Sequence, residues 1–288
     1  MLFVKDRWVI STGSARQLEQ TSIFSHLRGY VMKNLLRRGL QLLARQLASA
    51  AYLGRGFLFR LRRSPLAFWF WTVDRLCDGY FDGKFGIRSS ERRSLLELGI
   101  DLPQCIHYQP VSYTDFVQLL GMIQIVPNKD VFLDFGSGMG RAVCLAARYP
   151  FRSVIGVELS SELCGIAHEN VNAVRPKLRC QNIRIENLNA TEYCVPLEVS
   201  VIFFFHPFHG QVFERVLHNV AASIREHPRR LSVLFYGAGM APGRKELRNC
   251  DWLFEESEII LRTGNIGVIF KNCKWTGDAE WPAAAATG

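Results

Sequence analysis

Asp134, Gly136, Gly138 and Gly140 form the most chemically specific pattern in the sequence, Asp-Phe-Gly-Ser-Gly-Met-Gly. Glycines let a backbone turn tightly and approach a ligand, and a helix that follows them offers free N–H groups. Ser137 lies within the same loop. The pattern therefore predicts a loop that holds a nucleotide-like ligand where a strand turns into a helix.

Glu158 supplies a second functional group, 18 residues after Gly140. It ends an apolar run, where a carboxylate can accept hydrogen bonds from the hydroxyls of a ribose. A dinucleotide-binding dehydrogenase needs its third glycine one position later, where this chain has Arg141. Its fingerprint would not usually open with an acidic residue, and a plain glycine turn is the structural alternative. Together the two features favour S-adenosylmethionine over NAD.

The acidic residue followed by G-x-G-x-G resembles the first motif of the class I S-adenosylmethionine-dependent methyltransferases. The resemblance covers about residues 105–273. It implies that the 136–140 loop holds the methionine part of the cofactor and that Glu158 binds the ribose. Within that class, the run from Tyr80 through Gly86 to 108–110 is similar to a group of stand-alone methyltransferases. It is also distantly similar to the non-SET histone lysine methyltransferases.

Two positions depart from the pattern of that class. Many members carry an acidic residue that touches the adenine amino group, and Asn189 stands there with an amide oxygen that could accept the same hydrogen bond. His206 stands before Pro207, where several members have Asn or Asp. Histidine suits a general base for the methyl acceptor, and the alternative is a strand-end residue that bonds to backbone. DNA base methylation is disfavoured, because the amide or carboxylate for a flipped base is missing.

Three ring side chains, His107, Tyr108 and Tyr113, precede the first strand of the predicted domain. Related enzymes fold this segment over the cofactor, so we expect a lid in which Tyr108 binds the cofactor; core or surface packing is the alternative. The histidines and cysteines lack metal-ligand spacing, so no metal is expected. Ser137 lies outside a G-x-S-x-G elbow, which leaves a serine nucleophile unsupported.

The elements that must position these residues alternate between strand and helix from about residue 130, as in a parallel sheet covered on both faces. A terminal pair of strands joined by a turn at 262–265 looks antiparallel. The fold class is therefore α/β, a Rossmann-like seven-stranded methyltransferase sheet with an N-terminal helical extension. Predicted strands are 131–135, 153–158, 183–186, 199–205, 231–236, 254–261 and 266–271, and predicted helices are 141–149, 162–174 and 211–225.

Charge divides the 288 residues unevenly. The chain is 48% apolar and 21% charged, which excludes disorder and collagen. Its net charge is +9, yet residues 1–73 hold 12 Lys and Arg against Asp6 and Glu19. We expect a basic, partly amphipathic extension over 1–104, the methyltransferase domain over 105–273 and a flexible tail over 274–288. Leucines at 36, 40, 43 and 47 share one stripe of a basic helix.

The basic segment over residues 26–73 is compatible with a peripheral membrane site, an acidic partner, an organelle-targeting segment or a cap on the domain. Nucleic acid is disfavoured, because the rest of the chain is nearly neutral. No run of 18 apolar residues occurs, and no signal peptide is evident. Eight scattered cysteines indicate reduced thiols in an intracellular, cytoplasmic protein.

The predicted function is methyl transfer from S-adenosylmethionine to an oxygen or nitrogen atom of a small molecule or of a protein lysine. The hypothesis from another class is a non-catalytic module of methyltransferase-like fold, which docks through its basic extension to a membrane or partner. Intact glycines at 136, 138 and 140, together with Glu158, argue against that module. A decayed pocket should tolerate larger residues at those positions.

Overall fold

The computed structural model describes residues 2–4, 7–9, 78–237 and 243–272. Contacts divide the chain into two units, Met1–Arg63 and Ser64–Gly288. The expected basic helix and the C-terminal tail lie outside the described residues.

In the first unit, β1 (Leu2–Val4) and β2 (Arg7–Val9) pair antiparallel as a short hairpin.

A seven-stranded sheet forms the centre of the second unit, in the order β5-β4-β3-β6-β7-β9-β8. Strands β5, β4, β3, β6 and β7 run parallel, and β9 is antiparallel to both β7 and β8. This is the predicted sheet with its antiparallel terminal pair. The strands are β3 (Val131–Phe135), β4 (Ser153–Glu158), β5 (Ile183–Asn187), β6 (Val199–Phe204), β7 (Ser232–Gly237), β8 (Phe254–Ile260) and β9 (Ile266–Lys271).

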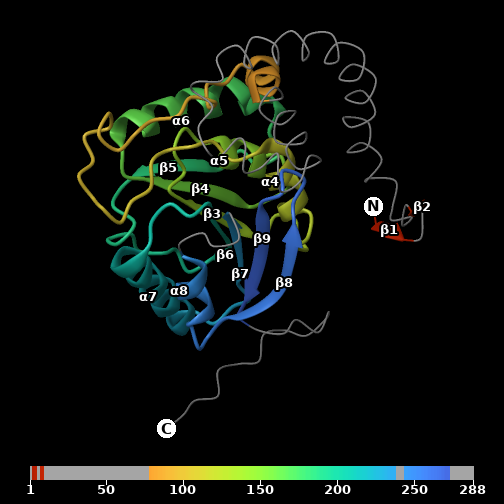
Figure 1. Cartoon of the computed structure of the whole chain (residues 1–288), viewed down its shortest axis with the longest axis vertical. Helices are drawn as coiled ribbons and strands as arrows, with labels where there is room; N and C mark the ends of the chain where they lie inside the picture. The colour runs from red at the N-terminus through yellow and green to blue at the C-terminus, as the bar shows by residue number, and fades with distance from the viewer. Residues whose placement is uncertain (1, 5–6, 10–77, 238–242, 273–288) are drawn as a thin grey trace, which may run out of the picture. The chain divides into compact units, whose positions relative to one another are not determined.

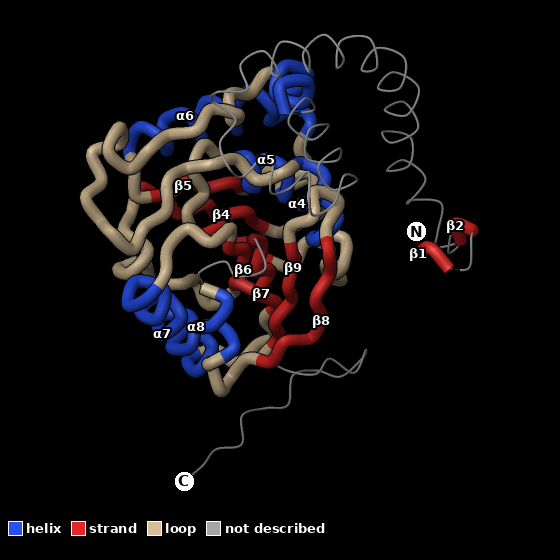
Figure 2. The backbone as a smooth tube through the Cα atoms, in the orientation of Figure 1, coloured by secondary structure: helices blue, strands red, loops and turns tan. Residues whose placement is uncertain are grey.

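Helices cover both faces of the sheet (Figure 1, Figure 2). One face carries α4 (Tyr113–Leu120), α5 (Arg141–Ala146) and α6 (Ser161–Val174), and a 3-10 turn, Arg175–Lys177, follows α6. The other face carries α7 (Gly210–Glu226) and α8 (Arg244–Arg248). Residues 78–85 are also helical. The sequence analysis identified the main helices but not the short α4 and α8.

The central strands are buried along their whole length because helices cover both of their faces. Every residue of β3, β4 and β6 is buried. The edge strand β8 instead alternates toward solvent, with Glu256 and Glu258 exposed. Phe135 and Phe204 stack across β3 and β6 with ring centroids 5.4 Å apart. This core fixes the strand ends from which the candidate site is built.

Local capping explains where the helices begin. Ser112 precedes α4, and its hydroxyl accepts a hydrogen bond from the Asp115 N–H. Ser160 caps α6 in the same way through the Leu163 N–H. Gly140 precedes α5 in a left-handed conformation, with φ of 76°. No helix among the described residues is long and apolar enough to cross a membrane.

Candidate active site

A cavity of about 200 Å³ opens where the carboxyl ends of four parallel strands meet. Ligands of open α/β sheets bind at this edge. Gly136 follows β3, Glu158 ends β4, Asn189 follows β5 and His206 follows β6, and all four line the cavity. Tyr108 lines it as well. The structure thus brings together five of the residues that the sequence analysis selected.

The glycine loop is shaped by close packing against the protein itself. Gly136 and Gly138 have φ of 73° and 54°, which disfavours any side chain. A Cβ on Gly136 would lie 2.5 Å from Pro207, and one on Gly138 would lie 2.1 Å from the Tyr108 ring. The sequence analysis assigned these glycines to ligand approach. Of the three, only Gly136 is among the residues that line the cavity, while Gly138 packs against the Tyr108 ring and Gly140 precedes α5.

Asp134 and Ser137 lie behind the cavity wall. Asp134 is only 3% exposed. Burial, and then the nearby Glu158 charge, raise the pKa of Asp134 well above its ordinary value. The buried Ser137 hydroxyl has no partner in the described part of the chain, and it lies against Gly156. A positive charge at the loop would compensate the buried Asp134 carboxylate.

Glu158 is held in place by backbone donors. Its Oε2 accepts a hydrogen bond of 2.8 Å from the Gly138 N–H, and its Oε1 accepts one of 2.9 Å from the Ser160 N–H. Burial raises the pKa of Glu158 above its ordinary value, against the lowering effect of these bonds. A carboxylate offers about four lone-pair directions. Capacity therefore remains for the two hydroxyls of a ribose at the cavity wall.

Asn189 forms a local turn that the sequence analysis did not foresee. Its Oδ1 accepts hydrogen bonds from the Thr191 N–H at 3.0 Å and from the Thr191 hydroxyl at 2.9 Å. The oxygen expected to accept from an adenine amino group therefore already has two donors. Thr191 is fixed in turn, because its carbonyl accepts from Asn219 of α7. Asn189 lines the cavity after β5, as expected, but its side-chain oxygen accepts the hydrogen bonds of the turn.

His206 stands out as a strained polar residue at the end of β6. Its φ of 29° is unusual for a non-glycine residue, and its Nδ1 is buried without a partner among the described residues. Burial lowers the pKa of His206 below its ordinary value, and this effect and that of the nearby His107 outweigh the raising effect of a hydrogen bond with its own backbone. The imidazole is therefore neutral near pH 7. Strain combined with an unpaired buried nitrogen is typical of a functional position.

A cover segment, residues 104–109, runs across the cavity beside the end of β6. The Ile106 N–H donates to the Pro207 carbonyl at 2.9 Å, and the His209 N–H donates to the Gln104 carbonyl at 3.0 Å. Leucine and isoleucine side chains just before the segment complete an apolar wall, which comprises Leu95, Leu98, Ile100 and Leu102. The sequence analysis missed this apolar wall, because residues 95–102 show no regular period.

The three expected lid residues separate in the structure. His107 and Tyr108 belong to the cover segment and line the cavity. Tyr113 does not line it; the residue begins α4, and its hydroxyl donates to Asp82 at 2.6 Å. The expectation of a lid residue at Tyr113 is therefore corrected, because its ring is buried in the core behind the glycine loop.

The residues that line the cavity and lie beside it match the groups of an adenosyl sulfonium compound. Glu158 can accept from ribose hydroxyls, and the partly exposed Leu159 and Leu188 offer apolar flanks for a purine. Asp134 supplies a buried carboxyl group beside the loop, which could ionise next to a cationic group. Across the described ranges, no group of three or more His, Cys, Asp or Glu residues could hold a metal ion. The six cysteines in those ranges are free thiols.

Comparisons with known proteins agree with this assignment at the level of the domain. A family model described as a methyltransferase domain matches residues 132–227. No curated protein matches the chain.

Solved structures with a similar fold include an RNA methyltransferase from Salinibacter ruber in complex with S-adenosyl-L-homocysteine. It is 16% identical, with a TM-score of 0.43, over 59% of this chain and 97% of that one. A SAM-dependent methyltransferase from Aquifex aeolicus is 15% identical, with a TM-score of 0.44, over 56% of this chain and 90% of that one. A ribosomal protein L11 methylase from Lactobacillus delbrueckii subsp. bulgaricus is 13% identical, with a TM-score of 0.41, over 54% and 75%.

Proposed function

We propose that this chain is a class I S-adenosylmethionine-dependent methyltransferase that methylates an oxygen or nitrogen nucleophile presented to His206, a proposal supported by the methyltransferase-domain family model that matches residues 132–227. The cofactor supplies an electrophilic methyl group on a sulfonium. Glu158 would hold the ribose, and the backbone at Gly136 with the Asp134 carboxylate would hold the methionine part. Tyr108 and Asn189 would close the two ends of the cavity.

The unpaired Nδ1 of His206 is the single observation that carries the catalytic part of the proposal. In methyl transfer by direct displacement, a lone pair of the aligned acceptor bonds to the methyl carbon as its bond to sulfur breaks and S-adenosylhomocysteine leaves, so an acceptor that is not already nucleophilic must give up a proton. A neutral imidazole can accept that proton, and the lowered pKa of His206 keeps it neutral at physiological pH. His206 is therefore the proposed general base.

An acceptor that enters without charge fits the cavity better than a lysine ammonium does. Glu158 is the only carboxylate among the described residues that line the cavity, and two backbone N–H groups already engage it. A buried cation without its own carboxylate would be costly. A small-molecule hydroxyl, or an amine that is neutral at pH 7 such as an aromatic amine, is therefore the favoured acceptor, ahead of a protein lysine.

The test is turnover with S-adenosylmethionine carrying a labelled methyl group, against separate panels of apolar phenols, amines and lysine peptides. Once an acceptor is found, His206→Gln should lower kcat by about 10²- to 10⁴-fold, the usual contribution of a general base. His209→Gln is the matched control, since His209 lies three residues later and is not among the cavity-lining residues. Equal rates for His206→Gln and the unaltered enzyme would remove His206 from the mechanism.

We also propose that the basic residues 26–73 attach the enzyme to an anionic membrane surface or acidic partner within the cytoplasm. The uneven charge of the sequence supports this proposal, since the excess of Lys and Arg is confined to the N-terminal part. Polybasic segments bind anionic lipid through summed electrostatic attraction.

A further inference from the structure

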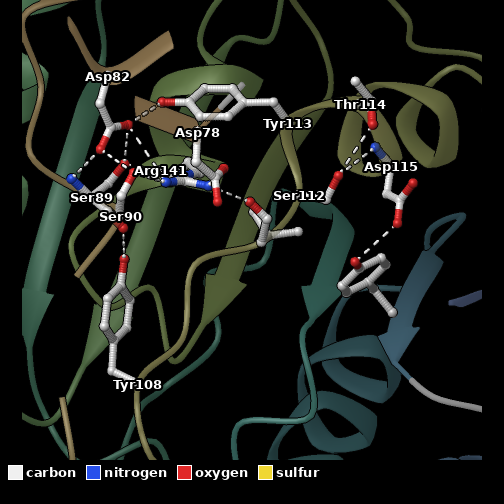
Figure 3. Close-up of polar contacts among 12 residues, drawn as sticks. Asp78, Asp82, Ser89, Ser90, Tyr108, Ser112, Tyr113, Thr114, Asp115 and Arg141 are labelled. Atoms are coloured by element: carbon white, nitrogen blue, oxygen red, sulfur yellow. Dashed lines mark hydrogen bonds and ion pairs between the residues drawn. The ribbon is translucent and has the colours of Figure 1, made fainter. Parts of the chain in front are cut away.

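Arg141 lies at the centre of a buried polar network directly behind the glycine loop (Figure 3). It is the first residue of α5, and it is only 2% exposed. Its guanidinium donates to Asp78 at 2.5 Å, to the Val111 carbonyl at 2.8 Å, and to the hydroxyls of Ser89 and Ser90 at 2.9 Å each. The N–H groups of the guanidinium thus bind a segment 50 or more residues earlier in the chain.

Asp82 fixes the same segment from the opposite side. Its carboxylate accepts from the Ser89 N–H at 2.9 Å, the Ser89 hydroxyl at 2.8 Å, the Ser90 hydroxyl at 2.6 Å and the Tyr113 hydroxyl at 2.6 Å. Burial raises the pKa of Asp82, but these bonds and the Arg141 charge outweigh it, so the pKa lies below its ordinary value. Asp82 is therefore ionised, and Ser89 is held by both its backbone and its side chain.

Ser89 connects this network to the cavity wall. Its carbonyl accepts a hydrogen bond of 2.9 Å from the Tyr108 hydroxyl, and the Tyr108 ring packs on Gly138. A second link runs through Asn170 of α6, whose amide donates to the carbonyls of both Arg88 and Met139. Residues 78–90 are therefore attached to the glycine loop at two separate points.

Packing alone does not account for an arginine at this position. The first turn of a helix disfavours a cation, because the helix dipole is positive there. Burial of a guanidinium also carries a desolvation cost that an apolar side chain would avoid. The arrangement instead gives the Ser89 carbonyl one orientation, and that orientation determines where the Tyr108 ring lies.

We propose that Arg141 is a positioning residue of the cofactor site, which holds Tyr108 against the glycine loop through Asp82 and Ser89. Residues 78–90 then belong to the cofactor site as well as to the fold. The inference rests on the proposed placement of S-adenosylmethionine beside Gly136 and Tyr108.

The test is a double-mutant cycle in which S-adenosylmethionine and S-adenosylhomocysteine are titrated calorimetrically into the full-length protein. Arg141→Lys keeps the positive charge but loses the planar guanidinium with its several N–H donors. We expect it to weaken the binding of both adenosyl ligands about tenfold. Tyr108→Phe keeps the ring but loses its bond to Ser89, and it should weaken binding in the same direction. The double variant should bind no more weakly than the weaker single variant, because both changes break one link.

Arg230→Lys is the matched control for stability. Arg230 pairs with the buried Asp130, which directly precedes β3 at the end of the strand opposite to the glycine loop. This control should lower the Tm but leave the Kd of both adenosyl ligands unchanged. If Arg141→Lys does not fold, Tyr108→Phe decides the question by itself.

Two results would overturn the inference. One is unchanged affinity in Tyr108→Phe and Arg141→Lys while the unaltered protein binds both ligands. The other is a double variant whose loss of binding free energy equals the sum of the losses in the two single variants. Failure of the unaltered protein to bind either ligand is distinguishable from both, because it would overturn the proposed site itself and this inference with it.

Discussion

At the scale of single residues, burial of the Asp134 carboxyl group makes its ionised form unfavourable, and a cationic ligand would relieve this cost. Its folded-state pKa is raised, so the folded protein binds a proton that the unfolded chain releases above about pH 4. Stability therefore falls as pH rises from that value toward the folded pKa. We expect Asp134→Asn to raise the free energy of unfolding at pH 7 by about 1 to 3 kcal/mol. Denaturant titrations at pH 4 and pH 7 would measure this gain, which should shrink at pH 4.

The same variant should bind S-adenosylmethionine more weakly than the unaltered protein, because its side chain can no longer ionise beside the cationic group. A variant that is less stable at pH 7 would show that the carboxylate has a partner in solution, and a variant that binds equally tightly would remove Asp134 from the cofactor site.

His206 gives a residue-scale prediction about pH. Its pKa is lowered below 6.5, and the neutral form is the proposed base. The rate of methyl transfer should therefore rise with pH through a midpoint below 6.5 and stay level near neutrality. A pH–rate profile of kcat/KM for the unaltered enzyme and His206→Gln would check this, and the acidic limb should vanish in the variant. Persistence of the limb would assign it to another group.

At the scale of elements, the close packing of the Tyr108 ring of the cover segment on Gly138 of the glycine loop can be tested by adding a side chain at Gly138. Gly138→Ala introduces a Cβ at positive φ, 2.1 Å from the Tyr108 ring. We expect a loss of about 1 to 3 kcal/mol in unfolding free energy, with weaker cofactor binding. Gly165→Ala is the control, because this glycine of α6 has nothing within 4 Å of its added Cβ. The control should gain about 0.5 to 1 kcal/mol. A Gly138→Ala variant with unchanged stability and cofactor affinity would contradict the close packing of Tyr108 on Gly138.

The elements were predictable to the extent that local pattern determines them. Continuous apolar runs predicted strands at 131–135, 153–158 and 266–271 with the observed bounds. The helix expected over 141–149 ends at Ala146, before Pro150.

The site was predictable only in part, for the same physical reason. Gly136, Glu158 and His206 could be placed because each follows a strand. The partners of Arg141 could not, since Asp78 and Asp82 are distant in sequence and their charges carry no information about pairing. The turn that occupies Asn189 depends on Thr191 and was equally hidden.

At the scale of the whole molecule, the uneven charge distribution predicts that the N-terminal segment binds anionic membranes. A chain that begins at Ser64 keeps the second unit but loses most of the basic excess. We expect the full-length protein to co-sediment with vesicles containing phosphatidylserine, and the shortened chain to remain in the supernatant. Binding should weaken as salt is raised from 50 to 500 mM, because screening shortens electrostatic attraction. Equal sedimentation of both chains would exclude docking through the N-terminal segment.

The measurement that tests the central claim most directly is calorimetric titration of the full-length protein with S-adenosylmethionine and S-adenosylhomocysteine, with NADH as the control ligand. Glu158→Ala is the matched variant, since the ribose hydroxyls are assigned to this carboxylate. The account predicts binding of both adenosyl ligands, a loss of about tenfold or more in the variant, and no heat with NADH. Binding of NADH, or no binding of either adenosyl ligand, would contradict it.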